Sequence, residues 1–389
     1  MKKKVIVIAI VLAIFAFMVI THFTEKGFNQ GRDTENNVQQ DFPSSEIQQP
    51  SNQKSNENCQ VQFTEYLVDP KYIQKVGQVG VVHGGGKSII ERSYISIRED
   101  YTEQEIPIYA PADMKLISGA HYKVPGSPEN TLADYVLKFD AGCGVEVLLG
   151  HLKGVVDSVS SKLTPLKASS AEDEIRPPIQ FKAGEQIGSY FKENKEGAVG
   201  GFDFVVRDRK VVNQFVNQER YSNDRARNLI NGVCPYDYFT EEKKQIYYNL
   251  LGSPGGIIFE VKDCGSVSRD KEGTISGMWF SNKEIQGTIY EDYKEGDYGS
   301  PLSIMGDEEA ATVGNIGTSS ALHRIYSDNP TYKLPTEVTT EHCYQIKSNL
   351  GNQGYVYLKL IDTETMDVYY SATGSCPSEI PTNAKRYYK

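Results

Sequence analysis

The sequence is poor in basic residues and in tryptophan. Its 41 Lys and Arg residues are outnumbered by 51 Asp and Glu residues, which gives a formal net charge of −10. A protein that binds nucleic acid needs a basic face to displace counterions from phosphate, so this balance argues against a nucleic-acid partner. Tryptophan occurs once, against 25 Tyr residues. This abundance of Tyr, together with many Val, Ile and Thr, favours strands over helices.

A structural zinc site is also disfavoured, because no two cysteines form a Cys-x-x-Cys pair. The six cysteines are Cys59, Cys143, Cys234, Cys264, Cys343 and Cys376. An even number behind a membrane-targeting segment is typical of disulfides formed in an oxidising compartment. We expect Cys343 to pair with Cys376, both on neighbouring predicted strands. Cys143 lies in a glycine hairpin loop, where we expect a disulfide and not a nucleophile acting with His151.

The N-terminus has the pattern of a membrane-targeting segment. Lys2–Lys4 precede an apolar run from Val5 to Ile20. This run, extended by a few residues, is close to the length that a bilayer requires. The residues after it, Thr21–Lys26, contain no small-x-small cleavage site. We therefore expect residues 1–24 to be a signal anchor with its lysines in the cytoplasm and the remainder of the chain outside. A cleaved signal peptide, which would leave a secreted protein, is the alternative.

The rest of the chain divides by composition. Residues 25–58 are rich in Gln, Asn, Ser, Glu and Pro and have few large apolar side chains, which predicts a disordered tether. Residues 59–252 contain the strand patterns of a first domain. Residues 257–389 contain several short strand patterns separated by Gly, Asn and Asp. These predict a second, small all-β domain, a barrel or a sandwich.

The first domain carries the pattern that bears on function. Ile106–Ile117 predicts a strand, a proline-containing turn and a second strand. Tyr135–Phe139 and Val145–Leu152 predict a hairpin. Gly200–Arg207 predicts a strand in which Asp203 faces away from its apolar neighbours.

Two further segments of this domain have their own signals. Residues 157–178 are polar and end in Pro177 and Pro178, which predicts a long loop. Thr240 is followed by two acidic residues, which predicts a helix N-cap and a helix that runs to Leu250.

Two stretches resemble ligand sites but lack a required feature. The run from His83 to Ser88 has the glycines and the Lys-Ser end of a phosphate-binding loop, but Val81 stands where that loop needs a glycine. A strand pattern follows it instead of a helix, so we expect a flexible hairpin loop. The acidic residues between Glu284 and Asp297 could hold calcium weakly, but their pattern is that of a solvated loop.

Four pieces of the first domain resemble, in this order, the lysostaphin-type or LytM-like zinc metallopeptidase family. Ile108–Asp113 is similar to the family's V-x-A-P-x-D-G strand and turn, with Met114 in place of its glycine. Leu149–Leu152 lies where the family has Y-x-H-L. Phe181–Gly188 resembles V-K-x-G-Q-x-I-G, and Gly201–Phe204 falls on H-x-H-F. The resemblance implies a duplicated-hybrid-motif β barrel.

The resemblance also implies a zinc site, from which this chain departs. The family's zinc ligands are a His and an Asp of an H-x-x-x-D element and the last His of H-x-H. Glu91–Asp100, where the first element should lie, contain no His, and Gly201 and Asp203 stand at the two histidines of H-x-H. Only His151, which would assist the bound water, is unchanged. Asp203 could still ligate zinc, and His83 from the preceding loop could complete a His83, Asp203 and His151 set.

We therefore expect a membrane-anchored, extracytoplasmic, mainly β protein with a degenerate LytM-like domain and a second small all-β domain. The expected role is an inactive homologue of a zinc metalloendopeptidase, without a cofactor. It would act as a binding or regulatory module for a cell-envelope peptide, glycan-peptide or protein partner. The alternative is an active zinc metalloendopeptidase that cleaves cell-wall or other extracellular peptides with a rearranged ligand set. A purely structural envelope protein is the third alternative.

Overall fold

The computed structural model describes most of the chain after residue 58. The described residues are 59–389 except 84–87, 90, 102–103, 124–132, 192–199, 222–226, 253–262, 284–301, 307–309, 317–320 and 348–352. The predicted signal anchor, the predicted tether and the acidic stretch from Glu284 to Asp297 therefore lie outside the described residues. Within the described part of the chain, no helix is long and apolar enough to cross a membrane.

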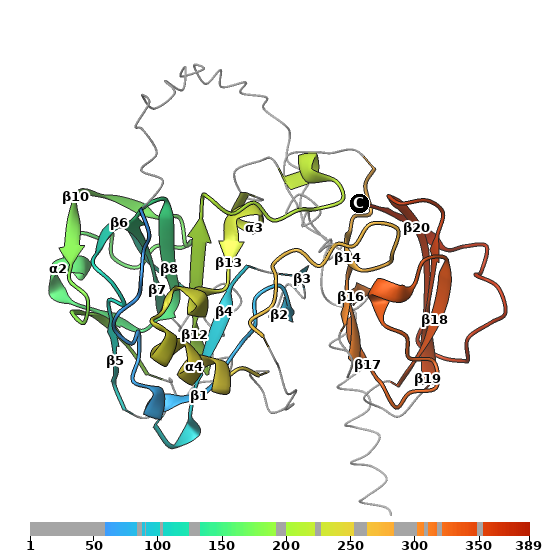
Figure 1. The fold of residues 1–389 in the computed structure, drawn as a ribbon, viewed down its shortest axis with the longest axis horizontal. Coiled ribbons are helices and arrows are strands. Elements are labelled where there is room, and N and C mark those ends of the chain that lie inside the picture. The colour runs from blue at the N-terminus through green and yellow to red at the C-terminus, as the bar shows by residue number, and fades with distance from the viewer. Residues whose placement is uncertain are drawn as a thin grey trace, which may run out of the picture. The chain divides into compact units, whose positions relative to one another are not determined.

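The protein is mainly β, as the composition predicts, and its largest sheet has eight antiparallel strands (Figure 1). In spatial order these strands are β1 (Ile73–Val76), β4 (Ser93–Ile97), β12 (Gly201–Asp208), β8 (Val145–Leu152), β7 (Ala133–Gly142), β6 (Met114–Lys123) and β10 (Asp173–Phe181), with β13 (Gly232–Val233) paired to β12. A second sheet has the order β5 (Ile106–Tyr109), β11 (Gln186–Tyr190) and β9 (Gly154–Val155). Apolar side chains from both sheets share one hydrophobic core. This core fixes which face of β12 points inward.

The predicted hairpin is confirmed, and so are the two strands around the proline-containing turn. β7 and β8 pair antiparallel around the turn that contains Cys143. The prediction of a loop over residues 157–178 is wrong for its last part, from Asp173 on, because β10 begins there. Pro177 and Pro178 lie where the pairing of β10 with β6 is interrupted, between Glu174 and Ile179. A sheet edge tolerates proline because a missing N–H there breaks no ladder bond, and the polar composition concealed this strand.

Helices are short and few among the described residues. The α-helices are α2 (Asp157–Ser160), α3 (Arg227–Asn231) and α4 (Glu241–Asn249), and the 3-10 helices are η1 (Pro70–Tyr72), η2 (Glu99–Tyr101), η4 (Gln218–Tyr221), η5 (Pro235–Tyr238) and η7 (Pro335–Glu337). α4 confirms the predicted helix. Thr240 is at its N-cap position, although no cap bond from the Thr240 side chain is present. The buried Tyr247 anchors α4 to the main core.

The C-terminal region contains two four-stranded antiparallel sheets, drawn in orange to red in Figure 1. One has the order β14 (Gly277–Trp279), β15 (Leu302–Gly306), β16 (Ala310–Ile316) and β17 (Ala321–Tyr326). The other has the order β18 (Glu341–Lys347), β19 (Gln353–Leu360), β20 (Thr365–Ser371) and β21 (Lys385–Tyr388). The two sheets share a second hydrophobic core in which Trp279 is fully buried. The predicted boundary between residues 252 and 257 falls outside the described residues.

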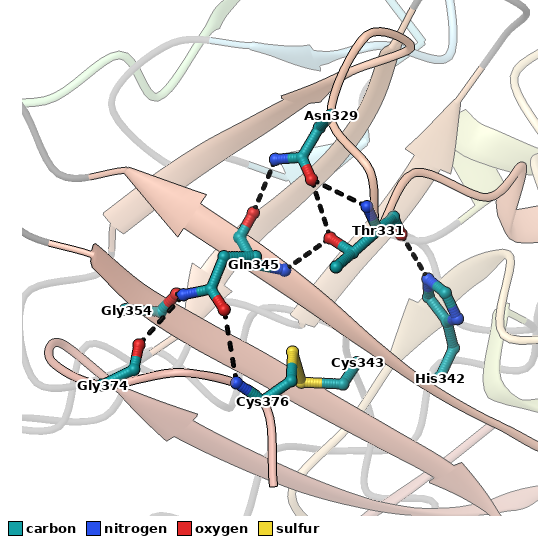
Figure 2. The surroundings of a disulfide bond; sticks show 8 residues. All are labelled: Asn329, Thr331, His342, Cys343, Gln345, Gly354, Gly374 and Cys376. Carbon is teal, nitrogen blue, oxygen red and sulfur yellow. Dashed lines mark hydrogen bonds between the residues drawn. A yellow bond between two sulfur atoms is a disulfide. The ribbon is translucent and has the colours of Figure 1, made fainter.

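All six cysteines form disulfides, which are Cys59–Cys143, Cys234–Cys264 and Cys343–Cys376. The predicted pairing of Cys343 with Cys376 is confirmed, as is the expectation that Cys143 is in a disulfide. Cys376 lies in the loop after β20 and not on a strand. Figure 2 shows that the Gln345 side chain fastens this loop to the sheet, because its amide accepts from the Cys376 N–H at 3.2 Å and donates to the Gly374 carbonyl at 2.9 Å.

The same surroundings explain how the free edge of β18 is covered. Asn329 donates to the backbone carbonyl of Gln345 at 2.9 Å, and Thr331 Oγ1 accepts from the Gln345 N–H at 2.8 Å (Figure 2). Unpaired backbone groups on an edge strand invite pairing with another chain. The side chains of the Asn329–Thr331 loop therefore satisfy the Gln345 backbone groups on this edge, in place of a fifth strand.

Candidate functional site

Asp203 lies in the middle of the large sheet and points away from the main core. Its neighbours Phe202 and Phe204 are fully buried in that core, so strand alternation directs the Asp203 carboxylate to the opposite face. Asp203 pairs with Tyr94 of β4 on one side and with Gly150 of β8 on the other. A Cβ atom at Gly150 would lie 3.0 Å from Asp203 Oδ2. The glycine therefore makes room for the carboxylate.

His151 follows Gly150 and has an unusual backbone. Its φ of 63° is in the left-handed region, which few residues other than glycine adopt. The imidazole Nδ1 lies 2.6 Å from Asp134 Oδ2 of β7. Because an ionised carboxylate only accepts hydrogen bonds, Nδ1 carries the hydrogen and Nε2 points elsewhere. Asp134 is completely buried, and its other oxygen accepts from the ammonium group of Lys153, whose side chain is 2% exposed.

Asp203 Oδ2 lies between two basic side chains. Arg92, the residue before β4, places a guanidinium nitrogen 2.6 Å from this oxygen, and His151 Nε2 lies 3.7 Å from it. We call Arg92, Asp134, His151, Lys153 and Asp203 the central ionic cluster. Both of its carboxylates are buried, whereas the Arg92 side chain is 37% exposed and that of His151 is 25% exposed. The more exposed side of the cluster is therefore formed by its two basic side chains, Arg92 and His151.

The contacts in the cluster change the pKa values of its members. Burial raises the pKa of Asp134, but the hydrogen bonds from His151 and Lys153 outweigh it and hold this pKa below its usual range. Burial lowers the pKa of His151, but the hydrogen bond to Asp134 and the charge of Asp203 outweigh it and raise this pKa. Each group therefore favours the charged form of its partner.

Two tyrosines lie on either side of the central ionic cluster and extend it into a row of polar side chains across the sheet. Tyr94 pairs with Asp203, and Tyr122 of β6 pairs with Asp134. Both side chains are buried. Burial, followed by the charges of nearby groups including Asp203 and Asp134, raises the pKa of both phenols, so both stay neutral at physiological pH. The row runs over β4, β12, β8, β7 and β6, which are neighbours in the sheet (Figure 1).

A catalytic zinc ion can be tested against these residues. Asp203 Oδ2 and His151 Nε2 are close enough to share an ion, since two ligands at about 2.0–2.1 Å from a tetrahedral zinc lie roughly 3.3 Å apart. However, the Asp203 oxygen already has the Arg92 guanidinium as its cationic partner. Within the described part of the chain, no three His, Cys, Asp or Glu side chains are arranged to hold a metal ion. The central ionic cluster therefore does not fit a catalytic zinc ion.

The structure brings two of the three predicted site residues together. His151 and Asp203 share the cluster, whereas the backbone of His83 belongs to β2 (Val82–His83), which forms a separate two-stranded sheet with β3 (Ser88–Ile89). The side chain of His83 lies outside what the structure describes, so its predicted role as a ligand stays a prediction. Cys143 is bound to Cys59 and has no thiol.

Sequence reasoning missed Arg92, Asp134 and Lys153. His151 and Lys153 are two residues apart, and strand periodicity alone could have placed both on one face. Arg92 lies in the stretch that aligns with the family's H-x-x-x-D element, a pattern in which arginine has no role. Asp134 immediately precedes the predicted strand that starts at Tyr135, and nothing local marks it as the partner of a residue on the next strand.

A separate cavity of about 300 Å³ opens near the other end of β12. Asp208 lines it, and both of its carboxylate oxygens accept hydrogen bonds, from the Tyr238 hydroxyl at 2.7 Å and from the Lys210 N–H at 2.9 Å. None of the predicted site residues lines this cavity. The central ionic cluster is thus the stronger candidate site.

The chain matches no protein-family model and no curated protein. The chemistry of the site must therefore be argued from its own residues.

Proposed function

We propose that this chain is a membrane-anchored, extracytoplasmic protein in which residues 59–252 form a non-catalytic, LytM-like binding module of the cell envelope. Its ligand would be a peptide carried on a glycan. The site would be the partly exposed side of the central ionic cluster, which is formed by the basic side chains of Arg92 and His151. The C-terminal sheets would form the second, small all-β domain.

One observation carries the non-catalytic part of the proposal, the 2.6 Å contact between Arg92 and Asp203 Oδ2. A hydrolytic metal site needs its ligand atoms to face the ion and one position open for water. A permanently charged guanidinium on the ligand oxygen opposes both requirements, because arginine does not lose its proton in proteins.

Two further observations support the family and the compartment. The four pieces of the resemblance include residues of β5, β8, β11 and β12. β12 pairs with β8 in one sheet, β11 pairs with β5 in the other, and the two sheets share one hydrophobic core. The three disulfides are typical of an oxidising compartment outside the cytoplasm. The apolar run from Val5 to Ile20 would anchor the chain there.

The test is sedimentation of the full-length protein, in detergent, with insoluble peptidoglycan. We expect the protein to sediment with the polymer equally well with and without a metal chelator, and we expect no release of peptide fragments. Arg92→Gln should weaken binding by about 10-fold, the cost of one charge-assisted hydrogen bond. The matched control is Arg98→Gln, which changes an exposed arginine at the other end of β4 whose partner is Asp100.

The outcomes separate the alternatives. Peptide release that a chelator abolishes would establish the rival reading, an active zinc metalloendopeptidase. Absence of sedimentation would overturn the proposed ligand. If Arg92→Gln and Arg98→Gln weaken sedimentation with peptidoglycan equally, the central ionic cluster is not the binding site.

A further inference from the structure

The central ionic cluster has two potential metal ligands, His151 and Asp203, beside the Arg92 side chain, which cannot act as a ligand. His151 Nδ1 is held by Asp134 at 2.6 Å, and Nε2 is directed towards Asp203, 3.7 Å away. A carboxylate that orients a histidine from behind is the usual support of a metal-bound imidazole. Asp203 then offers a second ligand atom. Arg92 contributes a cation where a third ligand is needed.

The charges around these donors oppose the binding of a metal ion. The buried carboxylates of Asp134 and Asp203 are each matched by one fixed cation, Lys153 and Arg92. A divalent ion would add two positive charges beside a guanidinium, next to carboxylates that are buried. Repulsion between charges about 4 Å apart is several-fold stronger there than in water. Uncompensated charge of this kind is costly in a buried site.

We propose that the Arg92 guanidinium is the resident cation of a latent divalent-metal site formed by Asp203 and His151, and that Arg92 alone sets the selectivity of this site against metal ions. The inference deepens the proposed function and rests on it, because a binding module whose site holds no metal needs a group that keeps metal ions out.

The length of the Arg92 side chain makes the inference testable by a single substitution at this position. A histidine at position 92 is shorter than arginine, but an imidazole plus a coordinate bond of about 2.1 Å spans roughly the length of an arginine side chain. Arg92→His would therefore supply a third ligand and remove the repelling charge together. Arg92→Ala removes only the charge, and Arg92→Lys keeps it.

The experiment is zinc titration of tag-free, full-length protein by calorimetry, with metal content measured after dialysis. We expect Arg92→His to bind about one zinc ion per chain at least about 100-fold more tightly than the native protein, since it removes a like charge and adds a ligand. Arg92→Ala should show a smaller increase in zinc affinity, and Arg92→Lys should show no increase. Adding Asp203→Asn to Arg92→His should abolish the gain. Arg98→His, which places a histidine beside an exposed aspartate, is the matched surface control.

A folding readout keeps the proposal falsifiable. If Arg92→His is unfolded without metal, zinc must restore its circular dichroism spectrum, and zinc must raise the melting temperature of Arg92→Ala but not that of Arg92→Lys. Equally weak zinc binding by the native protein, Arg92→His and Arg92→Ala would overturn the inference and leave the proposed function intact. Tight zinc binding by the native protein that Asp203→Asn removes would instead overturn the proposed function.

Discussion

Two ionic clusters lie on the same face of β12, four residues apart, and they are built in opposite ways. In the central ionic cluster the carboxylates of Asp134 and Asp203 are buried and the half-exposed groups are basic. In the second cluster Arg207, whose side chain is 12% exposed, lies between two carboxylates, 2.6 Å from Glu146 and 3.1 Å from Glu91.

The difference separates a structural ion pair from a candidate site. The Arg207 cluster contains no histidine, and Arg207 bonds to Glu146 directly across the paired strands. The central ionic cluster contains a histidine with a left-handed backbone, and the neighbouring Gly150 makes room for the Asp203 carboxylate. Unusual backbone conformations cost free energy and concentrate at functional sites. The comparison therefore supports function at Asp203 and scaffolding at Arg207.

The largest effect should come from removing the buried carboxylate of the central ionic cluster. Asp134→Asn leaves Lys153, which is 2% exposed, without its anionic partner. Breaking a buried pair in this way costs about 3–5 kcal/mol of unfolding free energy. Glu146→Gln should cost about 1 kcal/mol, because Glu146 is partly exposed and Arg207 keeps Glu91. Urea denaturation of both variants measures the difference, and similar costs would remove the distinction between the clusters.

A smaller effect should appear in the pH dependence of stability. The pKa of His151 is raised above its usual value of about 6.5, so its protonation stabilises the fold fully below that pH. This contribution is lost as pH rises through the raised pKa. His151→Gln should flatten the stability profile above pH 6.5, as followed by chemical denaturation.

The Arg207 cluster provides the contrast for that profile. Burial raises the pKa of Glu91, but the charges of Arg207 and Arg92 outweigh it and lower this pKa. Its stabilisation is therefore present above the usual pKa of glutamate and is lost only as the solution becomes acidic. Glu146→Gln should leave the slope above pH 6.5 unchanged. A flattened slope in this variant would contradict the assignment to His151.

Local pattern predicted much of the fold, because alternation and turn chemistry are properties of neighbouring residues. The hairpin around Cys143 and the two faces of β12 came from such patterns. β10 was missed because proline is compatible with a strand only at a sheet edge. That β10 is an edge strand becomes known only from the order of strands in the sheet. Arg92 and Asp134 were missed for a related reason. Their partners are distant in sequence, and only the register of β4, β12, β8 and β7 brings them together.

The smallest effect should come from the glycine that faces Asp203. In Gly150→Ala the new methyl group would lie 3.0 Å from Asp203 Oδ2 and 3.3 Å from Asp203 Cβ, so the carboxylate must move by a few tenths of an ångström. We expect a loss of about 1 kcal/mol of unfolding free energy, at the low end for overpacking, because one side chain can give way. Gly200→Ala is the control, since a Cβ atom there has no neighbour within 4 Å. The displaced carboxylate should also lower the pKa of His151, measured by NMR titration, because the charge of Asp203 helps to raise it. An unchanged pKa with lowered stability would show that the glycine serves packing alone, and the central ionic cluster would then resemble the Arg207 cluster more closely than the geometry indicates.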